Sequence, residues 1–425
     1  MYCGSCLRDN ALATELISRG HDVTLLPVYT PTLTDDENVS YDKVFFGGVS
    51  VYLEQYVPLF RNSPKWLDRL WDSKRILDLA TKRSISTSPK MLGEMTVSTL
   101  KGEAGFQHKE ITKLIDWLKS EDSPDIVSIP YTLLISLAKP IKEAIDKPVF
   151  CTLQGEDLFL EGLQEPYRSQ SKDLIKAQLK HVDAFISVSD YYARFMPKYL
   201  DIPKEKIHVV PLGIKLDGFE RGKRKPGPFT IGFFARIAPE KGLHVLADAY
   251  RRLRKKEALT SCRLEVAGYL PPEHQNYLDV IVREMNTAGL ADEFKYRGTL
   301  DREQKISFLQ SLDLLSVPAT YNEPKGIFLL EAMACGVPVV QPRRGAFTEI
   351  VENTGGGVLV EPDDVESLAE GFVTLANNAD LRERCSDSGY RKVRELYSVA
   401  RMADSALAAY ESVLNPRLEL LRAQG

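Results

Sequence analysis

The feature that most constrains the fold is an alternation of short apolar segments with amphipathic ones, which runs through both halves of the chain. In the first half, the predicted strands are Asp22–Val28, Asp125–Ile129, Pro148–Leu153, Ala184–Val188 and Ile207–Pro211. In the second half, they are Phe229–Ala235, Cys262–Ala267, Phe294–Tyr296, Leu314–Val317 and Val337–Val340, with helical segments between them. Strands that alternate with helices indicate parallel sheets covered by helices on both faces.

The length of the chain requires more than one hydrophobic core. For 425 residues, two or three domains of about 100–200 residues each are expected. The segment Asp217–Pro228 combines Gly, Pro and clustered charge, which is typical of an interdomain linker. We therefore predict a first domain over 1–212, a linker over 213–228 and a second domain from 229 onward.

Two features of the first half depart from a regular α/β pattern. Between about 41 and 108 the alternation is lost and aromatic residues are frequent, so we predict an insertion. Its aromatics could form core, an acceptor pocket or an interfacial patch. Core is the default, and stacking against a carbohydrate is the second choice. The first helix, about Ser5–Arg19, begins almost at residue 1, whereas such domains open with a strand and a Gly-containing loop. We therefore hypothesise that the reading frame extends upstream, and a stop codon just upstream in the genomic DNA would contradict this.

Composition and charge exclude several classes of protein. The chain has 55 Lys and Arg against 59 Asp and Glu, a formal net charge of −4, which argues against a protein that coats nucleic acid. No apolar run approaches the ~20 residues that span a bilayer, and no signal peptide is visible. The basic runs Arg221–Lys225 and Arg251–Lys256 leave open a peripheral contact with anionic lipid, although solvated surface is the favoured interpretation.

The six cysteines are too few for a disulfide framework, so reduced thiols and a cytoplasmic location are expected. Cys3 and Cys6 form a C-x-x-C at a helix start, where thiolates are stabilised. No second Cys or His pair has zinc-like spacing, so a redox or metal role is the less favoured interpretation and no metal site is predicted.

The strongest chemical signal is the segment YNEPKGIFLLEAMACGVP, in which Glu323 and Glu331 are separated by seven residues. Glu323 is predicted in a loop before a helix that starts near Gly326, and Glu331 on that helix. The exposed N–H groups of Ile327 and Phe328 at the helix start form an anion site. Such a site could hold a diphosphate, with a sugar hydroxyl on Glu323 and a ribose diol on Glu331. For an isolated pair of glutamates, a solvated helix is the simpler interpretation.

The second signal, GFFARIAPEKGL, predicts a strand that runs into a short loop and then a helix. Arg236 and Lys241 flank the loop, so both cations can converge on one anionic group. A departing nucleoside diphosphate needs such neutralisation, and Arg and Lys can supply it without a metal. Taken alone, two surface cations are the simpler interpretation.

Together, and in this order, the two segments resemble the donor-binding half of glycosyltransferase family 4, the retaining enzymes of GT-B fold. Supporting motifs also match in order: VPLGI at 210–214, LEVAG at 264–268, YRG at 296–298 and GAFTEIV at 345–351. The resemblance is strong over about 205–365 and weaker over 1–200. It implies two Rossmann-like domains facing each other across a cleft, with a second domain over 229–398. A last helix, about Val399–Leu421, would cross back so that 399–425 rejoins the first domain.

The resemblance implies roles for residues of the second domain. Arg236 and Lys241 would hold the diphosphate, Glu331 would bind the ribose hydroxyls, and Glu323 would contact the transferred sugar. Phosphate and sugar oxygens would also meet the backbone of Gly326, Ile327, Phe328 and Leu329.

Further residues are implied at the edges of the donor site. Arg297 and Gly298 would line the base. Gly4 corresponds to the family's glycine-rich loop in the first domain. Glu349 follows a Gly-containing loop and is assigned a phosphate contact or a structural role, with neither preferred.

The first domain departs from the family at one position. Family members carry a histidine in a T-x-H-G-type segment, where this chain has CTLQGED at 151–157. Gln154 replaces that histidine, which puts a proton-shuttling role in doubt but keeps hydrogen bonding, because an amide both donates and accepts. Glu156 or Asp157 could orient the acceptor hydroxyl, although helix N-terminal capping is the favoured interpretation of both.

The resemblance implies a retaining, metal-independent glycosyltransferase that moves a hexose from a nucleoside-diphosphate sugar to a hydroxyl of a glycan, a lipid or a small molecule, without a separate cofactor. Two alternatives to the transferase stay open as a second and a third interpretation. The missing first strand and Gln154 motivate a nucleotide-sugar-binding protein without transferase activity. The third interpretation is a GT-B epimerase of nucleotide sugars. The donor base, the sugar, the acceptor and the oligomeric state are not predicted.

Overall fold

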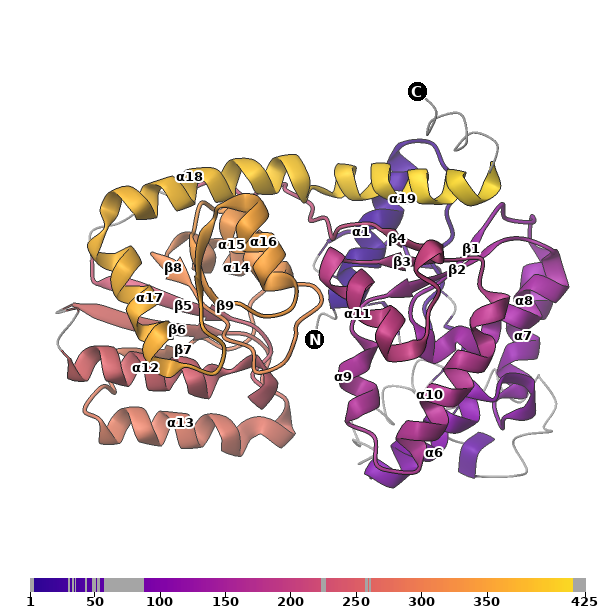
Figure 1. Cartoon of the computed structure of the whole chain (residues 1–425), viewed down its shortest axis with the longest axis horizontal. Helices are drawn as coiled ribbons and strands as arrows, with labels where there is room; N and C mark the ends of the chain where they lie inside the picture. Colours follow the sequence, from indigo (N-terminus) through magenta and orange to yellow (C-terminus); the bar gives the residue numbers. More distant parts are fainter. Residues whose placement is uncertain are drawn as a thin grey trace. The chain divides into compact units, whose positions relative to one another are not determined.

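The computed structural model describes residues 4–29, 31–32, 34, 36–42, 44–47, 51, 54–56, 88–222, 227–256, 259 and 261–415. Within them, the chain divides into two compact α/β units, each with a parallel sheet, which confirms the predicted fold class (Figure 1). The C-terminal unit comprises 211–402 with 189–191 and Gly4. The N-terminal unit comprises 5–188, 192–210 and the residues from Ala403 on.

The sheet of the C-terminal unit has the order β10-β9-β8-β5-β6-β7 among the described residues, and every pairing is parallel. Its strands are β5 (Phe229–Phe234), β6 (Cys262–Ala267), β7 (Phe294–Tyr296), β8 (Leu314–Leu315), β9 (Val339–Pro342) and β10 (Gly357–Val360). Its helices are α12 (Leu243–Lys255), α13 (Gln275–Thr287), α14 (Arg302–Gln310), α15 (Ile327–Ala334), α16 (Ala346–Thr354), α17 (Val365–Asn377) and α18 (Ala379–Leu396).

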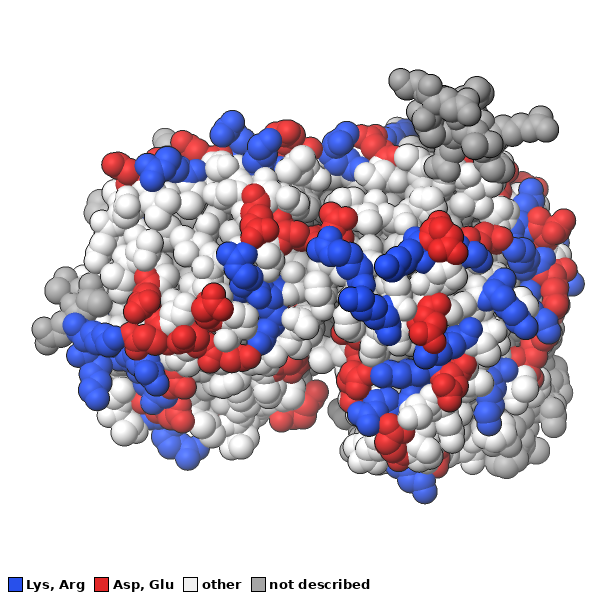
Figure 2. All heavy atoms as spheres, viewed as in Figure 1, with Lys and Arg blue, Asp and Glu red and all other residues white. Residues whose placement is uncertain are grey.

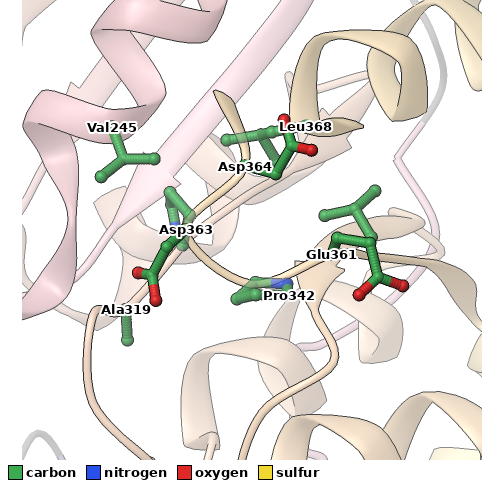
Figure 3. A pocket seen from close by; sticks show the side chains of 9 residues that line it. Val245, Ala319, Pro342, Glu361, Asp363, Asp364 and Leu368 are labelled. Carbon is green, nitrogen blue, oxygen red and sulfur yellow. The ribbon is translucent and has the colours of Figure 1, made fainter. Parts of the chain in front are cut away.

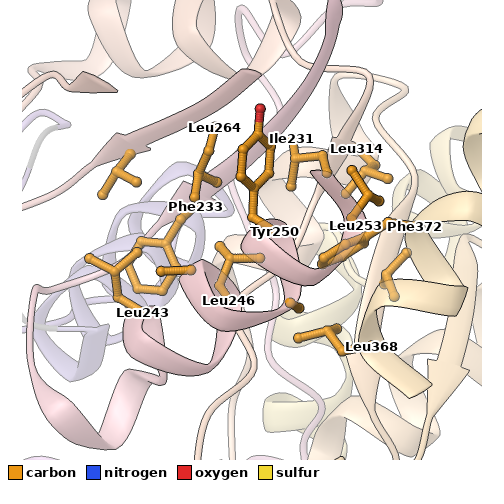
Figure 4. Close-up of a cluster of buried hydrophobic side chains, with 14 of the residues drawn as sticks. Ile231, Phe233, Leu243, Leu246, Tyr250, Leu253, Leu264, Leu314, Leu368 and Phe372 are labelled. Carbon is orange, nitrogen blue, oxygen red and sulfur yellow. The ribbon is translucent and has the colours of Figure 1, made fainter. Parts of the chain in front are cut away.

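Helices cover both faces of this sheet because alternate residues of each central strand point to opposite sides. In β5, Ile231 and Phe233 face a core formed with α12, α13 and α17 (Figure 4). Gly232, between them, faces the other side, where an added Cβ would collide with Leu312. That second core contains residues of α14, α15 and α16. The strands are therefore apolar on both faces, and for this reason they can be recognised in the sequence as continuous apolar runs.

The sheet of the N-terminal unit has the order β1-β2-β3-β4 and is also parallel. Its strands are β1 (Val127–Ile129), β2 (Val149–Leu153), β3 (Ala184–Ser187) and β4 (Ile207–Val209). Its helices are α1 (Gly4–Ser18), α6 (Pro89–Leu100), α7 (His108–Ser120), α8 (Ala138–Ile145), α9 (Glu156–Glu161), α10 (Tyr167–Gln178) and α11 (Asp190–Leu200), with a 3-10 segment η2 (Thr132–Leu137).

Helix α19 (Val399–Leu414) begins in the C-terminal unit, and from Ala403 its residues belong to the N-terminal unit. There, Arg19 donates to Asp404 at 2.7 Å, and the rings of Phe150 and Tyr410 lie 5.0 Å apart in an edge-to-face arrangement. Among the residues described, no helix is both long and apolar enough to cross a bilayer.

One predicted strand was wrong, and one strand of the structure was not predicted. The segment Asp22–Val28 forms only isolated bridges, Leu25 to Ser40 and Val28 to Phe45, rather than a strand. The strand β10 was not predicted, because Gly355 and Gly356 precede it, Gly357 is its first residue, and glycines normally mark a turn. Most of the predicted insertion at 41–108, including Trp66 and Trp71, lies outside the described residues.

Candidate active site

The loop between β5 and α12 carries Arg236 and Lys241 and lies against the segment that follows β8. Gly242, in the left-handed region at φ +76°, precedes α12, and a Cβ there would collide with the carbonyl oxygen of Pro318. The N–H of Thr320 donates to the carbonyl of Glu240 at 2.9 Å. This close backbone approach brings Lys241 to the segment 321–323.

Lys241, Tyr321 and Glu323 form a compact polar cluster. The Lys241 ammonium donates to the Tyr321 hydroxyl at 2.7 Å and forms an ion pair with the Glu323 carboxylate. The Tyr321 hydroxyl donates to the same carboxylate oxygen. Only 5% of the Glu323 side chain and 16% of the Lys241 side chain are exposed, so these charges interact with little screening. Tyr321 was part of the predicted segment, but no role was assigned to it.

The environment of Glu323 favours its ionised form. Burial by itself raises the pKa of this carboxyl, but the charge and hydrogen bond of Lys241 outweigh it, with smaller contributions from Tyr321 and Lys325. The pKa of Glu323 therefore lies below its ordinary value, and the group is a hydrogen-bond acceptor at neutral pH.

Helix α15 begins beside this cluster. Gly326, at φ +78°, is its N-terminal cap. Among the described residues, no acceptor meets the N–H groups of Ile327 and Phe328, as expected for the first turn of a helix. The Lys241 ammonium lies 5.8 Å from the centroid of the Phe328 ring. An ammonium and a helix N-terminus thus lie together, and both attract an anion.

The loop that carries Glu323 is fixed from the other side by the start of α16. The N–H of Ala346 donates to the carbonyl of Glu323 at 2.8 Å. Gly345, at φ +54°, lies so close that an added Cβ would be 2.8 Å from the backbone nitrogen of Glu323 and closer still to its carbonyl oxygen. The position of Glu323 therefore depends on glycine at 345.

Glu331 lies on α15 and forms an ion pair with Lys305 of α14, with 2.7 Å between Nζ and Oε1. Both side chains are buried. Lys305 was not predicted, because the sequence offers no signal for an ion-pair partner 26 positions away.

Arg236 and Arg297 are each paired with a carboxylate that was not predicted. The Arg236 guanidinium donates to Glu240 on its own loop. The Arg297 guanidinium makes two hydrogen bonds to Glu265 of β6, at 2.5 and 2.8 Å. Next to it, the carbonyl of Gly298 accepts from the N–H of Gly268 at 2.9 Å.

Two further predicted residues also lie in the C-terminal unit. Gly4 opens α1, and a methyl group added there would meet Cδ1 of Ile327 at 3.2 Å, so its backbone lies against the start of α15. The carboxylate of Glu349 accepts from the N–H groups of Asp190 and Tyr191 at 3.1 and 2.6 Å. Within the C-terminal unit, which includes residues 189–191, Glu349 therefore binds backbone N–H groups in this structure.

Gln154, Glu156 and Asp157 lie together at the carboxyl end of β2 in the N-terminal unit. Gln154 Nε2 donates to the carbonyl of Pro130 at 2.7 Å. Its Oε1 is buried and has no hydrogen-bond partner within the described part of the chain. This unsatisfied acceptor can bind a hydroxyl group or a water molecule.

The two carboxylates beside Gln154 are bound by protein groups. Glu156 accepts from the backbone N–H of Gln154 at 2.8 Å and from the Thr132 hydroxyl at 3.0 Å. Burial raises the pKa of the Glu156 carboxyl, and the hydrogen bonds it accepts offset part of that effect. Asp157 accepts from the Tyr192 hydroxyl at 2.7 Å.

A separate pocket opens at the carboxyl ends of β8, β9 and β10 (Figure 3). It is lined by Val245, Pro318, Ala319, Pro342, Val360, Glu361, Asp363, Asp364 and Leu368. Its three carboxylates and the lack of a cation among these residues do not suit a diphosphate.

On the face seen in Figure 2, positive and negative side chains are interspersed, without the broad basic surface that nucleic-acid binding requires. The cluster around Lys241 remains the candidate anion site.

Solved structures define the class of this protein by its fold. A sucrose-phosphate synthase from Thermosynechococcus elongatus superposes with a TM-score of 0.69 at 16% identity, over 95% of this chain and 91% of that one. HepE of Anabaena, in complex with UDP and glucose, gives a TM-score of 0.60 at 18% identity, over 72% of this chain and 81% of that one. The fold is the GT-B fold of glycosyltransferases.

Sequence comparisons identify the family. The model for glycosyl transferases group 1 matches residues 217–392, and the model for glycosyltransferase family 4 matches residues 98–217. Together they span more than half of the chain, and the chain belongs to glycosyltransferase family 4, as predicted. A phosphatidyl-myo-inositol mannosyltransferase of Mycobacterium leprae is 29% identical over 233 residues, which cover 54% of this chain and 59% of that protein.

Proposed function

We propose that the protein is a retaining glycosyltransferase that moves a hexose from a nucleoside-diphosphate sugar to a hydroxyl acceptor. One observation carries the proposal: within one unit, the Lys241 ammonium is paired with the buried carboxylate of Glu323 and lies 5.8 Å from the ring of Phe328, in the first turn of α15. A diphosphate is the ligand that suits the cation and the helix start, and a sugar hydroxyl suits the carboxylate.

The proposed chemistry is electrostatic. The bond between the anomeric carbon and the β-phosphate oxygen breaks, and its electron pair moves to that oxygen. The acceptor hydroxyl attacks from the same face and gives its proton to the departing diphosphate, so the anomeric configuration is retained. Lys241, Arg236 and the N–H groups of Ile327 and Phe328 stabilise the growing negative charge without a metal.

Other residues would orient the substrates. Glu331 would accept from the ribose hydroxyls, and Arg297 and Gly298 would border the base. Gln154 would accept a hydrogen bond from a substrate hydroxyl through its unpartnered Oε1. Glu156 and Asp157 would act indirectly, since Glu156 accepts from the Gln154 backbone.

The relatives support this proposal without fixing the substrates. HepE is described in complex with UDP and glucose, and the mycobacterial relative is described as a mannosyltransferase acting on phosphatidyl-myo-inositol. We infer a nucleotide-sugar donor and an acceptor that is a lipid, a glycan or a small molecule. The proposed location is cytoplasmic, with a peripheral membrane contact if the acceptor is a lipid.

Donor binding is expected to stabilise the protein against heat. A panel of UDP-, GDP- and ADP-sugars is screened by thermal shift, with the free sugars as matched controls. A ligand at a hundred times its dissociation constant adds about 2.7 kcal/mol to the free energy of unfolding, and only the correct nucleotide sugar should do so. If no nucleotide sugar raises the unfolding temperature more than its free sugar does, the donor site is wrong.

The product is expected to keep the anomeric configuration of the donor, which proton NMR of the purified product measures. Inversion would contradict the mechanism. Tight donor binding without transfer to any acceptor would favour the binding-protein alternative, and conversion of the donor without an acceptor would favour the epimerase.

A further inference from the structure

The pair formed by Lys305 and Glu331 is buried to an unusual degree for two opposite charges. Only 6% of the Lys305 side chain and 8% of the Glu331 side chain are exposed, and their Nζ and Oε1 atoms are 2.7 Å apart. Lys305 lies on α14 next to the buried Phe308 and Leu309. Its ammonium is also 5.6 Å from the centroid of the Phe219 ring, a distance at which a cation is attracted by the face of an aromatic ring.

Stability alone does not account for this pair. Replacing a buried ion pair by well-packed apolar residues is often neutral or stabilising, because desolvation of both charges offsets their attraction. An apolar side chain at 305 could extend the buried face of α14. The presence of a buried lysine here therefore indicates that Lys305 has a function that depends on the charge of Glu331.

We propose that Lys305 is a positioning residue that orients the carboxylate of Glu331 to accept both hydroxyls of the ribose of a nucleoside diphosphate. This inference rests on the proposed function. An ionised carboxylate has about four lone-pair positions and no proton to donate. Lys305 takes one position at Oε1, which fixes the plane of the carboxylate.

The test compares UDP, GDP and ADP with their 2′,3′-dideoxy analogues by isothermal titration calorimetry. The quantity of interest is the ratio of the two dissociation constants for the base that binds wild type best. Hydrogen bonds to charged groups are strong, so wild type is expected to prefer the ribose form by tenfold or more. Lys305→Met should lower this ratio to less than threefold, and Lys305→Arg should restore most of it.

Controls separate positioning from stability. Lys113→Met removes another poorly exposed ion pair, to Glu110 at 2.6 Å in the N-terminal unit, and should lower the unfolding temperature without changing the ratio. The double variant Lys305→Met/Glu331→Gln removes both charges of the pair, so it remains measurable if Lys305→Met does not fold. It should lack the preference for ribose, as Glu331→Gln should.

Failure of this inference is distinguishable from failure of the proposed function. If Glu331→Gln lowers the ratio and Lys305→Met leaves it at the wild-type value, Lys305 is only structural and the inference is overturned while the donor site stands. If neither variant changes the ratio, both this inference and the proposed contact of Glu331 with the ribose are overturned. If wild type binds none of the nucleoside diphosphates, both proposals fall.

Discussion

Replacing Lys241 with alanine is expected to lower turnover at saturating donor by about a hundredfold or more. Removing one preorganised donor to a developing negative charge costs about 3–4 kcal/mol in other enzymes. Here the ammonium lies at the start of α15, 5.8 Å from the Phe328 ring, where the departing diphosphate is proposed to bind. Because this charge develops in the transition state, the loss should fall on kcat rather than on the affinity for donor alone.

The measurement needs a control for stability, because Lys241 is also the ion-pair partner of Glu323. Glu323 is 5% exposed and paired with this ammonium, so Lys241→Ala leaves a buried carboxylate without its cation, which also reduces stability. The double variant Lys241→Ala/Glu323→Gln removes that unpaired charge and should recover stability without recovering turnover. Lys392→Ala deletes an exposed cation of α18, paired with Glu395 at 2.9 Å, and should change neither. Unchanged turnover in Lys241→Ala would reject the role proposed for this residue.

The strands that could be predicted from the sequence are those whose two faces are both covered by helices. β5 and β6 lie in the middle of their sheet with both faces covered, so their residues form apolar runs that stand out from the helices around them. β10 is an edge strand in the described sheet, and it follows two glycines and begins with a third, so its sequence is typical of a turn. The segment Asp22–Val28 is apolar enough for a strand, but pairing depends on its neighbours in space, and only single bridges form there.

The candidate site was predictable in its motifs but not in its pairings. The sequence predicts a helix at Gly326 and a cation at Lys241, because a glycine before a helix and a strand–loop–helix pattern are local signals. The ion pairs of Lys305 with Glu331 and of Arg297 with Glu265 join elements that only the folded chain brings together. The sequence gives the type of a charged residue but not whether its side chain is buried or exposed, so it does not distinguish a buried ion pair from charges at the surface.

Gly345→Ala is expected to lower turnover by about a hundredfold, although residue 345 carries no side chain that could touch a substrate. A methyl group there would lie 2.8 Å from the backbone nitrogen of Glu323 and closer to its carbonyl oxygen, and neither atom can yield without moving the loop. A displacement of ~1 Å in a catalytic group can cost about a hundredfold in rate. The loss is measured as kcat at saturating donor, and the unfolding temperature is recorded in parallel.

Gly289→Ala is the matched control for backbone strain. Gly289 has a positive φ of +74° and follows the end of α13, but nothing lies within 4 Å of the position its Cβ would occupy. Both substitutions force alanine to a positive φ that L-residues avoid, which should reduce stability by about 1–3 kcal/mol each. Only Gly345→Ala also pushes on the Glu323 loop, so turnover should fall in that variant and stay near wild type in Gly289→Ala. Equal losses of turnover in the two variants would mean that strain alone explains the effect, and the placement of Glu323 would then not depend on the contact with residue 345.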